Sequence, residues 1–153
     1  MPHVRVTASA VIPAPPEIVY GILADYRVGH PAILPPRYFR NLRVLEGGTG
    51  AGTRIAFQIV VGRSTRDIQA TITEPAPGRT LVETTDEGTE TGFTVASQPD
   101  GRSSLVTIAT AYRRAGIRGW IESVLAPAFL RPAYAAELRL LSEVAGREGR
   151  TRA

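Results

Sequence analysis

The sequence predicts an α+β fold in which a seven-stranded curved antiparallel sheet wraps around one long C-terminal helix. Three observations predict it: alternating segments typical of strands occupy most of residues 4–112, helical character lies near the N-terminus, and apolar residues recur at helical spacing across residues 114–146. The positions with that spacing are Ile117, Ile121, Val124, Leu125, Ala128, Ala133, Ala136, Leu140 and Val144. A helix with an apolar stripe has to cover an apolar surface, and the sheet before it is the available one. Such an arrangement readily leaves a cavity between sheet and helix.

The N-terminal part of the chain predicts one strand and two short helices. Residues 4–12 alternate apolar and polar side chains, which is the period of a half-buried strand. Three prolines end this strand, and a helix is expected over residues 16–25. A second short helical or irregular stretch, interrupted by glycine and proline, covers residues 26–36. A stretch of this kind often forms a lip.

Six further strands are expected. The turn between the third and fourth strands of the sheet sets the register of those two strands. The six strands cover residues 40–46, 53–61, a segment beginning at residue 64, and residues 79–85, 90–97 and 103–112. The two-residue connection Gly62-Arg63 suits a type II′ turn. Phe57 then pairs with Ile68 and Ile59 with Arg66, so that Arg66 lies on an otherwise apolar face.

The fifth and sixth strands have a less certain register. If Val82 opposes Phe93, the covered face receives Val82 and Thr84 together with Phe93, and Glu83 points to water. The sequence alone does not decide which face of the fifth strand is buried.

Two prolines interrupt the final helix. Because each removes a backbone donor and clashes with the preceding turn, the helix is expected to kink or restart, most simply with Pro127 as the first residue of a second piece and a bend near Pro132. Gly146 is expected as the C-cap. Residues 147–153 lack large apolar side chains and predict a flexible tail, which leaves one domain over residues 1–146.

Composition excludes several classes of protein. The 153 residues include no cysteine, which removes disulfides, thiolate zinc sites and cysteine nucleophiles and suits a reducing cytoplasm. No apolar run is long enough to span a membrane. The net charge of +4 comes from 18 basic residues, all arginine and dispersed along the chain, so no nucleic-acid partner is expected. With two histidines and no close carboxylate cluster, neither a metal nor another cofactor is expected.

The order of elements resembles that of the START-like (SRPBCC) superfamily of polyketide cyclases, dehydrases and lipid-transport proteins, which has the helix-grip fold. Local features that match are Ile12, Ala14, Pro15, Pro16, Glu17, Val19, Tyr20, Leu23 and Asp25 at the first helix, Gly50 and Gly52 before the third strand, residues 75–79 before the fifth strand, and Tyr134, Glu137, Leu138 and Leu141 in the last helix. The resemblance implies a hydrophobic cavity between sheet and helix, and it transfers no catalytic residue. Gly29-His30-Pro31 departs from the aromatic residue that is typical of members near this place, and the proline pair of the last helix is not general.

Two residues are candidates for chemistry. His30 has a side chain suited to proton transfer, although the simpler interpretation is that it caps a turn or packs on Tyr26 or Tyr38. Arg66 could bind a ligand carboxylate or enolate, or could extend its charged end into water. The residues expected around the cavity are Tyr26, His30, Tyr38, Phe57, Ile59, Arg66, Ile68, Phe93, Thr107, Ile121, Leu125, Phe129 and Tyr134. Taken one at a time, the aromatic side chains are more simply explained as core.

Three functions are compatible with these features. The first is a cytoplasmic carrier or sensor that encloses a hydrophobic small molecule, such as a lipid or a polyketide-like compound. The second is a metal-independent cyclase or dehydrase, of lyase or isomerase type, with His30, Arg66 or a cavity tyrosine as acid or base. The third is a protein-interaction module, which needs an exposed apolar patch. The sequence predicts no oligomeric state.

Overall fold

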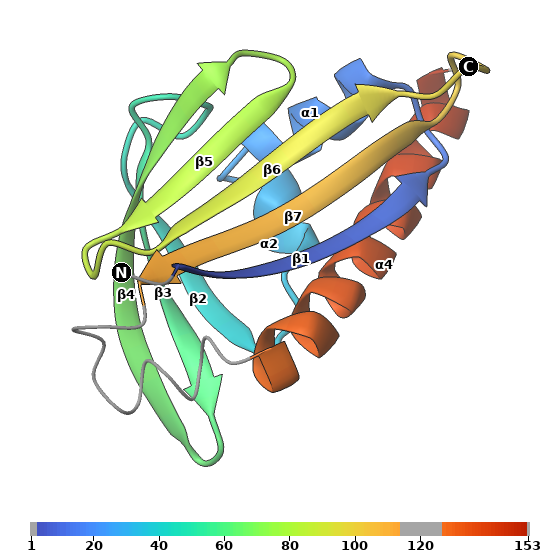
Figure 1. The fold of residues 1–153 in the computed structure, drawn as a ribbon. Coiled ribbons are helices and arrows are strands. Elements are labelled where there is room, and N and C mark those ends of the chain that lie inside the picture. Colours follow the sequence, from blue (N-terminus) through green and yellow to red (C-terminus); the bar gives the residue numbers. More distant parts are fainter. Residues whose placement is uncertain (1–2, 114–126, 153) are drawn as a thin grey trace.

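The computed structural model describes residues 3–113 and 127–152, and it has the predicted fold class (Figure 1). The strands are β1 (His3–Ile12), β2 (Phe39–Glu46), β3 (Arg54–Val61), β4 (Ser64–Ala76), β5 (Thr80–Thr85), β6 (Glu90–Ser97) and β7 (Ser104–Arg113). The described helices are α1 (Pro16–Ala24), α2 (Gly29–Ile33) and α4 (Pro127–Arg152). One antiparallel sheet has the order β1-β7-β6-β5-β4-β3-β2.

The two short helices carry the chain from one edge of the sheet to the other. Strands β1 and β2 are consecutive in the sequence but lie at opposite edges, and α1 and α2 connect them. In Figure 1 the curved sheet faces α4, and α1 and α2 lie on the same side of the sheet as α4. None of the described helices is both long and apolar enough to cross a membrane.

The register of the β3–β4 hairpin is as predicted. Phe57 pairs with Ile68 and Ile59 with Arg66, on either side of the two-residue turn. Gly62 in that turn has a φ of 59°, the left-handed region that glycine adopts without a steric penalty.

The pairing of β5 with β6 differs by one residue from the expected one. Leu81, and not Val82, opposes Phe93, and Val82 opposes Gly92. Because side chains alternate across a strand, this shift reverses the face of β5 that is covered. Leu81 is fully buried, and Glu83, two residues further on, lies on the same inner side. The expectation that Glu83 points to water is therefore wrong.

Helix α4 begins at Pro127, as predicted, but it does not end at Gly146. The helix continues to Arg152, and its last turns approach the β1–α1 connection, where a Cβ on Gly149 would lie 3.7 Å from the Cβ of Ala14. Because Gly146 lies inside the helix, it does not act as a cap.

The buried face of α4 also differs from the expected stripe. Its buried residues are Leu130, Ala133, Tyr134, Glu137, Leu138, Leu141 and Ala145. Ala128 is exposed, and Leu140 and Val144 are only partly buried, because the larger side chains at neighbouring positions fill the space under the sheet. Ile117, Ile121, Val124 and Leu125 lie outside the described residues.

Candidate functional site

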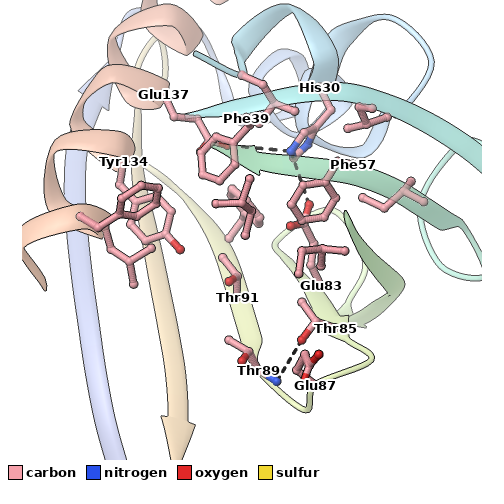
Figure 2. Close-up of a pocket in the computed structure, with 18 residues that line it drawn as sticks. His30, Phe39, Phe57, Glu83, Thr85, Glu87, Thr89, Thr91, Tyr134 and Glu137 are labelled. Carbon is pink, nitrogen blue, oxygen red and sulfur yellow. Dashed lines mark hydrogen bonds and ion pairs between the residues drawn. The ribbon is translucent and has the colours of Figure 1, made fainter. Parts of the chain in front are cut away.

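A cavity of about 90 Å³ lies between the concave face of the sheet, α2 and α4 (Figure 2). Its apolar lining consists of Leu34, Phe39, Leu42, Ile55, Phe57, Ile59, Ile68, Phe93, Phe129 and Leu130. Its polar lining consists of His30, Glu83, Thr85, Glu87, Thr89, Thr91, Tyr134 and Glu137. A space of this size is larger than a single water requires. The cavity therefore offers apolar walls with a small number of placed polar groups, as ligand sites do.

His30 reaches the cavity because α2 packs closely on α1. The carboxylate of Asp25 accepts hydrogen bonds from the backbone N–H groups of Arg27, Val28 and Gly29, which shapes the start of α2. A Cβ on Gly29 would lie 2.6 Å from the carbonyl oxygen of Ile22, so only glycine permits this approach. His30 is thereby held with 2% of its surface exposed.

The two ring nitrogens of His30 have different roles. Nδ1 lies 2.8 Å from the carbonyl oxygen of Leu23. Since a carbonyl oxygen only accepts hydrogen bonds, we assign the proton to Nδ1, and Nε2 of the neutral ring is then an acceptor. The ring stacks on Tyr26 with centroids 4.4 Å apart and meets the edge of Phe93 at 5.5 Å. The expectation that His30 packs on Tyr26 is correct.

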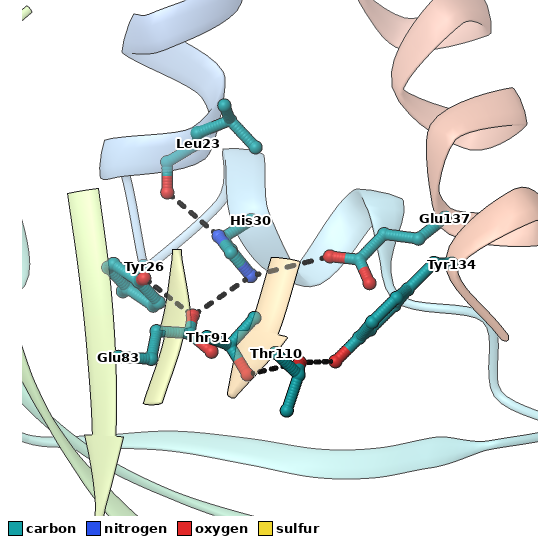
Figure 3. Close-up of polar contacts among 8 residues, drawn as sticks. All are labelled: Leu23, Tyr26, His30, Glu83, Thr91, Thr110, Tyr134 and Glu137. Atoms are coloured by element: carbon teal, nitrogen blue, oxygen red, sulfur yellow. Dashed lines mark hydrogen bonds and ion pairs between the residues drawn. The ribbon is translucent and has the colours of Figure 1, made fainter. Parts of the chain in front are cut away.

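Two carboxyl groups face Nε2 of His30 from separate elements (Figure 3). Glu83 of β5 places Oε2 at 3.4 Å, and Glu137 of α4 places Oε1 at 3.8 Å. The hydroxyl of Tyr26 donates a hydrogen bond of 2.6 Å to Glu83 Oε2. We call His30, Glu83, Glu137 and Tyr26 the His30 cluster.

The two carboxyl groups of the His30 cluster have unlike environments. Burial, and secondarily the charge of Glu83, raise the pKa of Glu137 well above its ordinary value. Its Oε1 is buried and has no hydrogen-bond partner among the described residues. Glu83, in contrast, is partly exposed and accepts from Tyr26. Burial and the neighbouring Glu83 also raise the pKa of Tyr26, which keeps it a donor. A buried carboxyl group with a raised pKa is a candidate for acid–base chemistry.

A second polar feature joins α4 to the sheet. The hydroxyl of Tyr134 is hydrogen-bonded to Thr110 of β7, whose own hydroxyl lies 2.8 Å from that of Thr91 on β6. Burial raises the pKa of Tyr134, so that its hydroxyl stays protonated. The chain of three hydroxyls satisfies a buried tyrosine and fixes one wall of the cavity.

Seven of the residues expected around the cavity line it: His30, Phe57, Ile59, Ile68, Phe93, Phe129 and Tyr134. Tyr26 is fully buried behind His30 and contributes through Glu83. Tyr38 packs edge-on against Phe129, 5.6 Å between centroids, and is outside the lining. Ile121 and Leu125 belong to the part of the chain that is not described.

Two expected residues do not line the cavity. Arg66 pairs with Ile59 as predicted, but it is exposed, near the hairpin end and beyond the lining residues. Thr107 bonds to Ser9 on the opposite face of the sheet, at 3.0 Å between hydroxyl oxygens. This prediction is wrong because Val106 and Ile108, its neighbours in β7, are the residues that point inward.

Glu83 and Glu137 are the residues of the His30 cluster that sequence reasoning missed. For Glu137 a signal existed, because Tyr134, Leu138 and Leu141 place it at helical spacing within a set of large apolar side chains. For Glu83 none existed, because its face depends on a one-residue choice of register. Within the described ranges, no group of three or more histidine, aspartate or glutamate side chains is arranged to hold a metal ion.

Comparisons with known proteins agree with this architecture. The sequence matches the family described as polyketide cyclase/dehydrase and lipid transport over residues 3–146. It has no match among curated proteins. The solved KanY protein is 28% identical with a TM-score of 0.80, and the match covers 95% of this chain and 99% of that one.

Two more distant structures share the fold. The Zhui aromatase/cyclase from Streptomyces sp. R1128 is 19% identical with a TM-score of 0.71, covering 95% of each chain. Norcoclaurine synthase from Thalictrum flavum is 15% identical with a TM-score of 0.71, covering 95% of this chain and 88% of that one. At these identities the likeness concerns the fold alone.

Proposed function

The chain belongs to the polyketide cyclase/dehydrase and lipid transport family, and from this premise we propose that it binds a hydrophobic small molecule in the cavity between sheet and α4. One observation carries the proposal: the walls are mostly aliphatic and aromatic, and His30, Glu83 and Glu137 of the His30 cluster bring a small number of largely buried polar groups into the lining. The ligand would place its apolar body against the walls and a polar group against the cluster. The cysteine-free composition supports a reducing compartment such as the cytoplasm.

Native mass spectrometry and thermal shift test this proposal. A co-purified small molecule would identify the ligand class directly. In a panel of fatty acids, sterols, flavonoids and polyketide mimics, a ligand at 100 times its Kd stabilises the fold by about 2.7 kcal/mol. For a domain of this size that corresponds to a rise in Tm of roughly 5 to 10 °C.

A cavity-filling variant provides the control. Ile59 lines the cavity, whereas Val60 follows it on the other side of β3. Ile59→Trp should abolish the shift caused by the ligand, and Val60→Trp should retain it. If the whole panel leaves the Tm of the native protein unchanged, binding of apolar ligands is not its function.

The His30 cluster favours a second candidate, acid–base catalysis of the cyclase/dehydrase type. Nε2 of His30 can accept the α-proton of a β-hydroxy ketone, and protonated Glu137 can donate a proton to the departing hydroxyl. The C–H and C–O bonds break, a C=C bond forms and water leaves. The proton then on His30 returns to Glu137, which restores the starting state.

Absorbance of the enone product tests the catalytic candidate. The protein should accelerate dehydration of an aromatic β-hydroxy ketone, and His30→Asn and Glu137→Gln should each remove the acceleration. Glu143→Gln, on an exposed position of the same helix, should not. If the protein binds the substrate without converting it, its function is that of a carrier and not of an enzyme.

A further inference from the structure

Carboxyl groups outnumber basic groups among the described ionisable residues that line the cavity. Among the lining residues that the structure describes, Glu83, Glu87 and Glu137 carry carboxyl groups, His30 carries an imidazole, and none is arginine or lysine. This contrasts with the whole chain, whose net charge is +4. The expected cationic partner, Arg66, lies outside the lining. These walls therefore favour a cationic ligand over an anionic one.

The His30 cluster presents three acceptors to one region of space. In the neutral form of the ring with its proton on Nδ1, Nε2 of His30 is an acceptor, while Glu83 offers carboxylate oxygens and Glu137 offers Oε1. Glu137 Oε1 is buried and has no hydrogen-bond partner among the described residues, which is unusual enough to require an explanation. A ligand donor at this position would supply the missing hydrogen bond.

A primary ammonium group matches this arrangement of acceptors. It has three N–H donors and no acceptor, whereas a hydroxyl has one donor. His30 Nε2 lies 3.4 Å from Glu83 Oε2 and 3.8 Å from Glu137 Oε1. At these separations one ammonium nitrogen can lie at an ordinary hydrogen-bond distance from both atoms of each pair. The aromatic side chains Phe39, Phe57, Phe93, Phe129 and Tyr134 also line the cavity, and aromatic faces attract cations.

We propose that the cavity selects ligands whose hydrophobic body carries a primary ammonium group, held among His30 Nε2, Glu83 and Glu137. The inference rests on the proposed binding function and adds the chemical class of the polar group. Glu83 and Tyr26 fix one side of the ammonium site, and Glu137 closes it from α4 (Figure 3).

Binding of an ammonium group is coupled to a proton on Glu137. In the empty cavity burial raises the pKa of Glu137 and so favours its protonated form. The ionisable groups that surround it are Glu83, His30, Tyr26 and Tyr134. A cation at hydrogen-bond distance stabilises the carboxylate, so Glu137 releases its proton when the ligand binds. Affinity should accordingly rise with pH until Glu137 is ionised in the empty protein.

Calorimetry with matched probes tests the inference. The probes are 2-phenylethylamine, 2-phenylethanol and 3-phenylpropanoate, together with the corresponding naphthyl compounds, titrated at neutral pH. The amine should bind at least about tenfold more tightly than the alcohol, as expected for charge-assisted hydrogen bonds, and the carboxylate should bind least. Titrations in two buffers of different ionisation enthalpy should show release of a proton with the amine and none with the alcohol.

Variants assign the effect to the His30 cluster. Glu137→Gln keeps the shape but cannot become anionic, so it should lower amine affinity by about tenfold or more, leave alcohol affinity nearly unchanged and abolish proton release. Glu83→Gln should also lower amine affinity selectively. Glu143→Gln, exposed on α4, is the matched control and should behave as the native protein.

The outcomes separate this inference from the proposed function. Equal or tighter binding of the alcohol or the carboxylate overturns the ammonium site and leaves the binding function intact. Absence of binding by all probes, in both ring sizes, overturns the inference for aromatic amines, and the wider ligand panel then decides the binding function separately. Binding of the amine by the native protein without release of a proton also counts against the ammonium site. This measurement needs no variant.

Discussion

Nδ1 of His30 lies 2.8 Å from the carbonyl oxygen of Leu23, and this contact sets the chemistry that His30 can offer to the cavity. Because the carbonyl can only accept, the proton of the neutral ring is on Nδ1 and the lone pair of Nε2 faces Glu83 and Glu137. The contact depends on how closely α2 approaches the end of α1. The packing of two short helices thus determines the character of the site.

Substituting Gly29 with alanine should disturb both stability and binding. Its Cβ would lie 2.6 Å from the carbonyl oxygen of Ile22, so α2 would have to shift and carry His30 with it. We expect a loss of about 1 to 3 kcal/mol in the free energy of unfolding, measured by urea denaturation, and weaker binding of any ligand that contacts His30.

Gly21→Ala is the control for that substitution. Gly21 lies in α1, and a Cβ added to it would meet no atom within 4 Å, so alanine should raise the free energy of unfolding by about 0.5 to 1 kcal/mol. Equal effects of the two substitutions would show that the contact with Ile22 does not limit the approach of α2.

Glu137 should make stability depend on pH. Its pKa in the folded state is raised above its ordinary value of 4.5, so the folded state retains a proton that the unfolded chain loses. The contribution of Glu137 to the free energy of unfolding should be fully present below pH 4.5 and be lost as the pH rises toward the folded pKa, by at most about 1.4 kcal/mol per pH unit for one proton.

Denaturation of the native protein and Glu137→Gln across this pH range checks that prediction. The difference in the free energy of unfolding between the native protein and the variant should decrease with rising pH, because the variant has no carboxyl group at this position to ionise. A difference independent of pH would mean that Glu137 is already ionised in the folded protein, and both its role as an acid and the proton release on binding would then be lost.

Thr110→Val should destabilise the protein through Tyr134. The substitution keeps the shape of the side chain but removes the hydroxyl that is hydrogen-bonded to Tyr134 and Thr91. Leaving a buried hydroxyl without its partner should cost about 1 to 3 kcal/mol in the free energy of unfolding. The double variant with Tyr134→Phe should lose less than the sum of the two single variants, and additive losses would show that the hydroxyls do not interact.

Arg66→Leu should leave ligand binding unchanged. Arg66 is exposed and lies outside the cavity lining, although its pairing with Ile59 is as predicted. In calorimetry with a carboxylate probe and a neutral probe, the variant should bind each probe with the same affinity as the native protein does. A selective loss of carboxylate binding would restore the interpretation of Arg66 as an anion-binding residue.

The sequence by itself determined the parts of this protein that depend on local order. Alternation and proline placement predict the strands, the first helix and the start of α4, and the turn at Gly62 predicts the pairing of Phe57 with Ile68. These features arise between residues close in the chain, or from a turn whose length leaves one register. The apolar character of most of the cavity walls followed from them.

Only the tertiary structure decided where the ionisable groups lie. Glu83 faces the cavity because Leu81 rather than Val82 opposes Phe93, and a one-residue difference in register reverses the direction of every side chain in the strand. Glu137 meets His30 because α4 turns its face of larger residues toward the sheet, which is a property of packing between distant segments. The His30 cluster joins α2, β5 and α4, and the burial that this packing produces is the main cause of the raised pKa of Glu137.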